Sequence, residues 1–194
     1  MIERKQHMIK TDIDIRFAGN DLTQQEWNDI WEILCECNNE FVPPLSSRNS
    51  SSQADLRTGP GAAGACAADQ PFAYFEELRK QQFIIAVKDS RVVGFLSFRT
   101  GYICDALSDF GASNYITTVC VRKDSRKQGI LTMMYELMET GLPDEVDCDR
   151  ISTRTWSQND PQINTLMKKG FSIVKRIADD RGPGVDTLYF GKVK

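Results

Sequence analysis

The stretch VRKDSRKQGIL, which runs from Val121 to Leu131, lies between two segments of different character. The preceding residues 114–121, NYITTVCV, are rich in β-branched side chains and predict a strand. The segment that follows has apolar residues at helical spacing through Met138 and predicts a helix. Four basic residues precede the single glycine, Gly129. The stretch is therefore expected to be the turn by which a strand enters the N-terminus of a helix.

Such a turn is suited to binding an anion. The first N–H groups of a helix have no partner inside it, and the helix dipole favours negative charge there. Gly129 lacks a Cβ, so a ligand can approach the backbone closely. No acidic residue follows until Glu136, whereas Arg126 and Lys127 add positive charge. A phosphate would supply the missing negative charge. A solvated basic turn before a surface helix is the alternative, and the P-loop pattern is absent.

Length and composition indicate an ordinary globular protein. The chain has 194 residues, of which 41% are hydrophobic and 26% charged, with a net charge of −3. This length predicts a single domain over residues 1–194. The acidic balance and the lack of a long basic tract argue against nucleic-acid binding, and no apolar run is long enough to span a membrane. Because the first residues lack the apolar core of a signal peptide, a cytoplasmic location is expected.

The cysteines do not form a recognisable site. The chain has six cysteines and one histidine, His7, and no two cysteines form a C-x-x-C pair. A metal site is therefore not expected, and the thiols are expected to be reduced.

The remaining sequence predicts a mixed α/β chain. A strand over residues 12–17 precedes a helix that Asp21 or Thr23 would cap. Residues 43–69, which are rich in Ser, Ala, Gly and Pro, predict a mobile insertion. The later elements are a helix at 72–81, a hairpin over 83–100, a strand at 150–156, a helix from Asn159 to Gly170 and a closing hairpin over 171–193.

The order of these elements and three local motifs resemble the GNAT superfamily of acyl-CoA N-acyltransferases. Val121, four further residues and RKQGIL at 126–131 match a strand end followed by R/Q-x-x-G-x-G/A. Asn159 stands twelve residues before Phe171 of KKGF, and VVGFLSF at 92–98 is similar to the second and third strands of the family. The resemblance covers nearly the whole chain outside the insertion. It implies an α/β (α+β) fold with a mixed, mostly antiparallel sheet of about seven strands and about four helices.

The resemblance also implies a site. Members of the family bind the pyrophosphate of acetyl-CoA with the amides of this turn and the pantetheine arm along the preceding strand. The chain would thus be an acetyl-CoA-dependent N-acetyltransferase that acts on a primary amine of a small molecule or peptide. The implied acetyl-CoA-binding residues are Val119, Cys120, Val121, Arg126, Lys127, Gln128, Gly129, Ile130, Leu131, Thr132 and Asn159.

Two positions depart from the family pattern. Leu131 fills the second glycine or alanine slot, which predicts altered packing with the N–H group still available. Leu166 stands where many members carry a tyrosine that protonates the leaving thiolate. Because a thiol with a pKa of about 8.5 leaves tolerably without an acid, this loss would slow the reaction without preventing it. General acid catalysis typically contributes ~10²–10⁴-fold.

The strand over 114–121 contains no Asp or Glu to act as a general base. Tyr115 is the candidate catalytic hydroxyl, with packing as the alternative role, and Tyr189 is a weaker candidate. The amine would attack the acetyl carbonyl directly, with the oxyanion held by a backbone N–H of this strand. Cys120 suggests a covalent alternative, but His7 lies near the terminus and cannot be expected to activate it, so a buried structural thiol is preferred.

The acceptor and the function remain open at this point. Arg154 and Arg181 favour a carboxylate-bearing amine, and Trp156 is expected to line the site. Acidic residues in two loops favour a cationic amine, unless they are ordinary turn residues: Asp105, Asp109, Asp179, Asp180 and Asp186. The alternatives to the enzyme are a catalytically weak acyl-CoA-binding or regulatory module and an unrelated interaction protein without CoA affinity. Acetyl-CoA and a small amine are the expected partners, and a homodimer is one option for the assembly.

Overall fold

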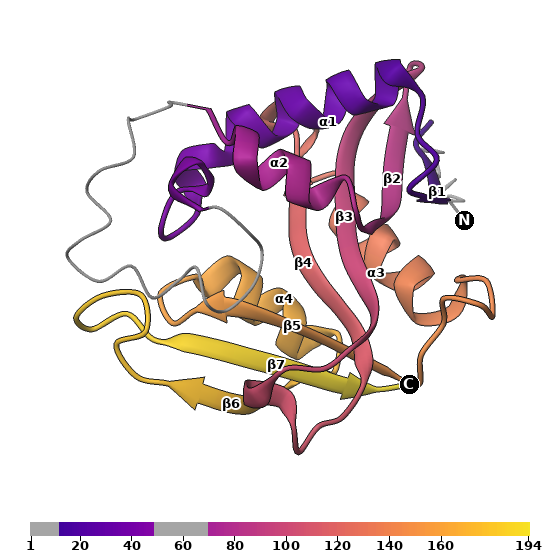
Figure 1. The fold of residues 1–194 in the computed structure, drawn as a ribbon. Helices are drawn as coiled ribbons and strands as arrows, with labels where there is room; N and C mark the ends of the chain where they lie inside the picture. The colour runs from indigo at the N-terminus through magenta and orange to yellow at the C-terminus, as the bar shows by residue number, and fades with distance from the viewer. Residues whose placement is uncertain (1–11, 49–69) are drawn as a thin grey trace, which may run out of the picture.

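The computed structural model describes residues 12–48 and 70–194. These residues form one seven-stranded sheet in the order β1-β2-β3-β4-β5-β7-β6, with helices on both faces (Figure 1). The strands are β1 (Asp14–Gly19), β2 (Gln82–Lys88), β3 (Arg91–Tyr102), β4 (Ser113–Val121), β5 (Arg150–Trp156), β6 (Ser172–Ile177) and β7 (Thr187–Val193). The helices are α1 (Gln24–Cys37), α2 (Phe72–Leu78), α3 (Ile130–Thr140) and α4 (Asp160–Lys168).

The pairing confirms the predicted fold class. Neighbouring strands are antiparallel at every junction except β4–β5, which is parallel. Of the predicted insertion, residues 49–69 lie outside the described residues. The described part contains the short 3₁₀ helix η2 (Leu45–Ser47), in which Leu45 is fully buried.

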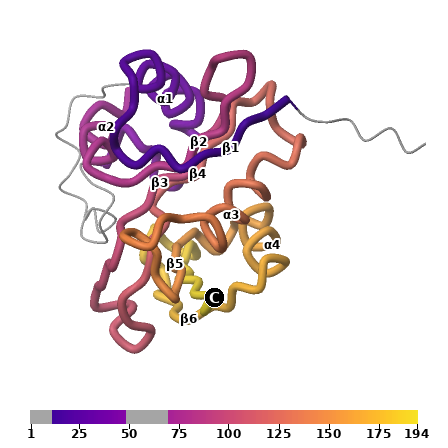
Figure 2. Tube along the Cα trace, turned by 90° about the vertical axis from the view of Figure 1, so that its right-hand side faces the viewer, coloured from indigo at the N-terminus to yellow at the C-terminus, as the bar shows by residue number. Residues whose placement is uncertain are grey.

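Helices cover the two faces of the sheet with separate apolar clusters. Strand β2 shows the reason, because its side chains alternate between faces. Phe83 and Ile85 pack against α1 and α2, whereas Ile84 and Ala86 pack in a second cluster that contains α3 and α4 residues. Figure 2 shows α1 and α2 on one side of the strands and α3 on the other. None of the helices in the described ranges combines the length and the apolar character that crossing a membrane requires.

Local signals fix the first elements of the fold. Thr23 caps α1 by accepting a hydrogen bond from the N–H of Glu26 at 3.3 Å, and the Glu26 carboxylate accepts one from the N–H of Thr23 at 2.8 Å. This reciprocal capping box stabilises the helix start. Asp89 and Ser90 form the turn between β2 and β3 with φ values of 50° and 62°. Positive φ at both central residues is typical of the two-residue hairpin turn that suits strand twist.

Candidate active site

Strands β4 and β5 separate part-way along their length, as Figure 1 shows. Their pairing joins Asn114–Ile116 to Ile151–Thr153 and then stops. At the same place the register between β3 and β4 shifts by one residue at Thr117, which marks a β-bulge. A cleft of about 470 Å³ lies between the separated strands.

Beyond the bulge, β4 presents unpaired backbone groups to this cleft. The N–H of Arg122 donates to the carbonyl oxygen of Val93 on β3, at 2.9 Å. Because successive residues of a strand direct their N–H groups to opposite edges, those of Val121 and Val119 point to the edge that β5 has left. This edge can therefore pair with an extended ligand that carries amide groups.

The turn from β4 into α3 continues the row of N–H groups. The 3₁₀ helix η5 (Lys123–Ser125) leads into Lys127 and Gly129, whose φ values of 62° and 79° are both left-handed. Gly129 precedes α3, and no side chain caps the helix start. Within the part of the chain that the structure describes, the N–H groups of residues 127–132 donate to no other residue. Such a row at a helix N-terminus is a ready-made anion site.

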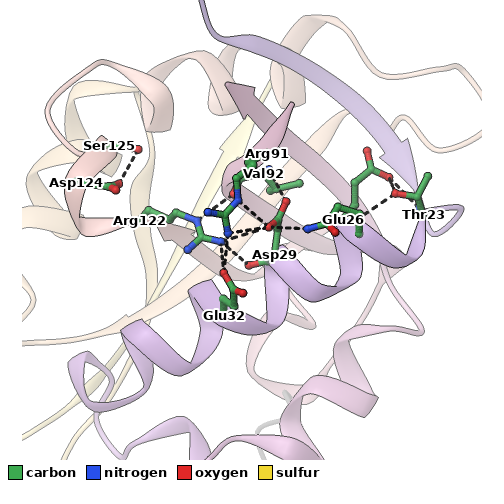
Figure 3. A network of polar contacts seen from close by, with 10 residues as sticks. Thr23, Glu26, Asp29, Glu32, Arg91, Val92, Arg122, Asp124 and Ser125 are labelled. Carbon is green, nitrogen blue, oxygen red and sulfur yellow. Dashed lines mark hydrogen bonds and ion pairs between the residues drawn. The ribbon is translucent and has the colours of Figure 1, made fainter. Parts of the chain in front are cut away.

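Acidic residues of the first helix region bind two of the nearby arginines. Arg122 Nη2 lies 2.8 Å from the Glu32 carboxylate and 3.5 Å from that of Asp29 (Figure 3). Arg126 Nη2 lies 2.9 Å from the Glu40 carboxylate. Much of the positive charge of the turn is thus balanced inside the protein. The sequence did not indicate these pairs, because the partners lie 86 to 93 residues earlier in the chain.

Strand β4 thus opens onto a cleft and turns through Gly129 into the uncapped start of α3. The sequence comparison agrees with this arrangement. Residues 27–171 match the sequence profile of the Acetyltransferase (GNAT) family. The chain belongs to the GNAT family. No curated protein sequence matches the chain.

Solved structures of GNAT proteins share the fold at low sequence identity. An N-acetyltransferase from Staphylococcus aureus Mu50 is 14% identical, with a TM-score of 0.59 over 94% of this chain and 99% of its own. Arabidopsis thaliana NAA60, in complex with a bisubstrate analogue, is 17% identical, with a TM-score of 0.58 over 93% and 98%. The NatC complex bound to a Gag peptide and CoA is 16% identical, with a TM-score of 0.59 over 95% and 99%.

Most of the residues implied by the GNAT resemblance lie together along the cleft. Those in its lining are Val119, Cys120, Val121, Arg126, Lys127, Gly129, Ile130, Leu131 and Asn159. Gln128 and Thr132 are outside the lining, although their N–H groups belong to the row at the turn. The Gln128 amide oxygen accepts from Lys88 Nζ at 3.4 Å, and its Nε2 donates to the carbonyl oxygen of Asp124 at 3.5 Å. Coenzyme contacts of all these residues stay predictions.

Asn159 is held at the wall of the cleft by its role in α4. Its Oδ1 accepts from the N–H of Gln162 at 3.4 Å and caps the helix. Its Nδ2 donates to Oγ1 of Thr155 on β5 at 3.0 Å. The side chain therefore links the start of α4 to the separated strand, and a contact with the pantetheine arm remains to be tested.

Two buried thiols, Cys37 and Cys120, line the cleft. A hydrogen bond between them lowers the pKa of Cys37, whereas the same bond and burial raise the pKa of Cys120. A thiol with a raised pKa is a poor nucleophile, which disfavours a covalent route through Cys120. Within residues 12–48 and 70–194, no three His, Cys, Asp or Glu side chains are placed to hold a metal ion.

The structure places Tyr115 and Leu166 outside the lining of the cleft. Tyr115 packs with Leu107 and Tyr189 in a small apolar cluster, where burial raises its pKa. Because Tyr115 does not line the cleft, its role as a catalytic hydroxyl stays a prediction. Leu166 is fully buried in the cluster shared with α3, and its neighbour Thr165 faces the cleft instead.

Helix α2 contributes a cleft residue that the sequence did not single out. The hydroxyl of Tyr74 lies 2.8 Å from Oγ1 of Thr118 on β4, and both residues line the cleft. Tyr74, Phe75 and Leu78 form the buried stripe of α2, and this helical spacing predicts burial. It does not predict which residue faces the bulge, because that depends on how α2 docks on the sheet.

Proposed function

We propose that this GNAT protein transfers an acetyl group from acetyl-CoA to a primary amine. One observation carries the proposal: the unpaired N–H groups on the open edge of β4 lead directly to those at the start of α3. The first part of this row suits the amide-bearing pantetheine arm, and the second part suits a pyrophosphate. This row of donors would therefore suit both the pantetheine arm and the pyrophosphate of one acetyl-CoA molecule.

The chain offers specific groups for each part of acetyl-CoA. The N–H groups at Gly129–Thr132 would donate to the pyrophosphate, and an added Cβ at Gly129 would meet no atom within 4 Å, so there is room beside it. Lys127 lines the cleft and, among the described residues, has no ion-pair partner, so its ammonium group is available to a phosphate. Arg126 would contribute only in competition with Glu40.

The proposed reaction is a direct acyl transfer. Bound acetyl-CoA supplies an activated thioester. The amine nitrogen forms a bond to the acetyl carbon, the carbon–sulfur bond breaks, and one proton passes from nitrogen to sulfur, which gives an amide and free CoA thiol. The N–H of Val119 is the donor nearest the bulge on the open edge, and it would stabilise the developing oxyanion.

Proton transfer has few candidate groups in the described lining. Glu40 is its one carboxylate, and it is engaged by Arg126 beside the phosphate end of the cleft. Deprotonation of the amine would therefore pass through water, which is slower than transfer to a placed base. The paired hydroxyls of Tyr74 and Thr118 are the groups that could return a proton to the thiolate.

Thermal unfolding with acetyl-CoA tests the coenzyme part of this proposal. At a ligand concentration about 100-fold above Kd, the native state gains about 2.7 kcal/mol, which corresponds to a rise in Tm of roughly 5–10 °C. An equal concentration of AMP should cause a much smaller shift. If acetyl-CoA leaves Tm unchanged, the assignment of the cleft is wrong.

Turnover separates the enzyme from a binding module. Free thiol should appear when acetyl-CoA is mixed with the protein and an acceptor from a panel of amines. A clear thermal shift without thiol release on any amine would instead favour the catalytically weak acyl-CoA-binding alternative.

The substitution Glu40→Gln should tighten acetyl-CoA binding about threefold, because it removes a negative charge beside the expected phosphate position and releases Arg126. Titration calorimetry would measure this change in Kd. Glu32→Gln is the matched control, since Glu32 also pairs with an arginine but lies outside the cleft lining. Weaker binding by the Glu40 variant would show that Glu40 serves to position Arg126 rather than to compete for it.

A further inference from the structure

Three arginines from separate segments line one part of the cleft. Arg48 follows η2, Arg154 belongs to β5, and Arg181 lies in the loop between β6 and β7. Arg154 directly follows Thr153, the last β5 residue that pairs with β4, so it stands beside the point where the strands separate. The turn into α3 begins at the far end of β4, roughly 16 Å along the strand. The arginines therefore lie apart from the expected phosphate position.

Backbone carbonyl groups and an aromatic ring hold two of these side chains in place. Nη2 of Arg48 donates to the carbonyl oxygen of Pro43 at 2.6 Å, and Nη1 of Arg181 donates to that of Val42 at 2.6 Å. The Arg181 guanidinium also lies 5.7 Å from the centre of the Trp156 ring. Each guanidinium has further N–H donors beyond those bonds. The groups are thus fixed in position by neutral partners, which leaves their charge uncompensated by these contacts.

The third arginine is held by a phenol. Nη1 of Arg154 donates to the hydroxyl of Tyr189 at 3.3 Å. Among the described residues, Asp180 adjoins this region; its carboxylate accepts from Oγ1 of Thr187 at 2.7 Å and only partly opposes the lowering of the Arg181 pKa by burial. In the described ranges, Asp180 thus adjoins a set of three guanidinium groups.

The electrostatic state of Arg181 reflects the proximity of the other two arginines. Burial, and then the charges of Arg48 and Arg154, lower the pKa of Arg181 to about 9 in spite of Asp180. Burial likewise lowers the pKa of Arg48, and the charge of Arg154 adds to that effect. Clustered, buried like charges are costly unless an opposite charge joins them. An anion placed among the three side chains would relieve this repulsion.

We infer that the acceptor amine carries an anionic group, a carboxylate or a phosphate, which Arg48, Arg154 and Arg181 bind together. The inference rests on the proposed function, because it concerns the second substrate of the same cleft. A planar guanidinium can bind two oxygens of a carboxylate or phosphate at once. Anchoring the anion next to Arg154 would place a nearby amino group at the bulge of β4, where the open N–H of Val119 begins the expected acetyl position.

Matched pairs of acceptors test this inference. We would measure thiol release with phenylalanine and phenethylamine, with glutamate and 4-aminobutyrate, and with phosphoethanolamine and ethanolamine, and use putrescine as the cationic acceptor. In at least one pair, the member with the additional anionic group should have a kcat/KM about 100-fold above its partner. Preference within an amino-acid pair identifies a carboxylate, and preference for phosphoethanolamine identifies a phosphate.

The substitution Arg154→Met should lower kcat/KM for the preferred anionic acceptor about 100-fold and leave the KM for acetyl-CoA within about twofold. The discrimination between the members of the pair should also fall to a few-fold. Arg150→Met is the control, because Arg150 lies on the same strand, is exposed and is outside the cleft lining. Putrescine as the best acceptor, or an equal loss on every acceptor, would overturn the inference.

A binding measurement keeps this test separate from that of acetyl transfer. N-acetylphenylalanine, N-acetylglutamate and N-acetylphosphoethanolamine would be added to the CoA complex, and the rise in Tm compared between wild type, Arg154→Met and Arg150→Met. A shift that Arg154→Met alone removes supports the anion site even if no amine is acetylated, in which case the proposed transferase activity fails. If no anionic amine is turned over and no acetylated anion binds, the inference is wrong.

Discussion

Gly129→Glu should abolish the rise in Tm that acetyl-CoA causes, with a loss of affinity of at least about 100-fold. The new carboxylate would stand among the N–H groups that begin α3, where it repels a pyrophosphate and can itself accept their hydrogen bonds. Nothing lies within 4 Å of an added Cβ, so the structural cost comes from the φ of +79° and should be about 1–2 kcal/mol. Thermal unfolding with and without acetyl-CoA measures both effects.

Gly111→Glu provides the matched control for that variant. Gly111 has a φ of +87°, nothing lies within 4 Å of its added Cβ, and it is outside the cleft lining. It should lose similar stability and keep the full response to acetyl-CoA. Gly129→Asn should retain much of the binding, because asparagine tolerates a left-handed φ and adds no charge. An unchanged response in Gly129→Glu would mean that the phosphates bind at another turn.

Asp29→Ala should cause the largest loss of stability, about 3–5 kcal/mol in the free energy of unfolding. The Asp29 side chain is 1% exposed, and its carboxylate accepts from the N–H of Val92 at 2.9 Å and from Arg91 Nη2 at 3.2 Å (Figure 3). Arg122 Nη2 lies 3.5 Å away, and its side chain is 15% exposed. Removing the carboxylate leaves the buried N–H of Val92 without its acceptor and takes a buried charge partner away from Arg91 and Arg122. Urea unfolding would measure the change.

Glu32→Ala is the comparison for that variant. Glu32 contacts the same two arginines, but its side chain is 53% exposed, so its loss should cost under about 1 kcal/mol. Asp29→Asn, which keeps an acceptor for the N–H of Val92, should fall between the two alanine variants. Equal losses at Asp29 and Glu32 would refute the view that burial makes the Asp29 contacts important.

The sequence predicted the order of elements and the turn that begins α3, because their signals are local. Strand residues with branched side chains, the pair Asp89-Ser90, the cap at Thr23 and the glycine before an apolar helical stripe each act within a few residues. The family motif at Gly129 added the expected coenzyme position. The predicted segments match the bounds of the seven strands and four α-helices of the described residues to within a few positions, whereas the short 3₁₀ helices were not predicted.

The charge arrangement of the site could not be predicted in the same way. Glu40 binds Arg126 from 86 residues earlier, and Arg48 joins Arg154 and Arg181 from a segment whose composition indicated only a loop. Such contacts depend on how distant elements pack. Leu166 illustrates the same limit, since its position in the sequence matches a catalytic slot while the rotation of α4 directs it into the core.

The short junction between β4 and β5 has a mechanical consequence. Three residue pairs are the only backbone ladder that joins β1–β4 to β5–β7 in the described sheet, so cohesion between the two halves depends heavily on side-chain packing. If acetyl-CoA binds as proposed, its amide groups would extend this ladder along the open edge of β4. The substrate would then act as a temporary eighth strand, and amide hydrogen exchange along β4 would slow each time the cleft is filled.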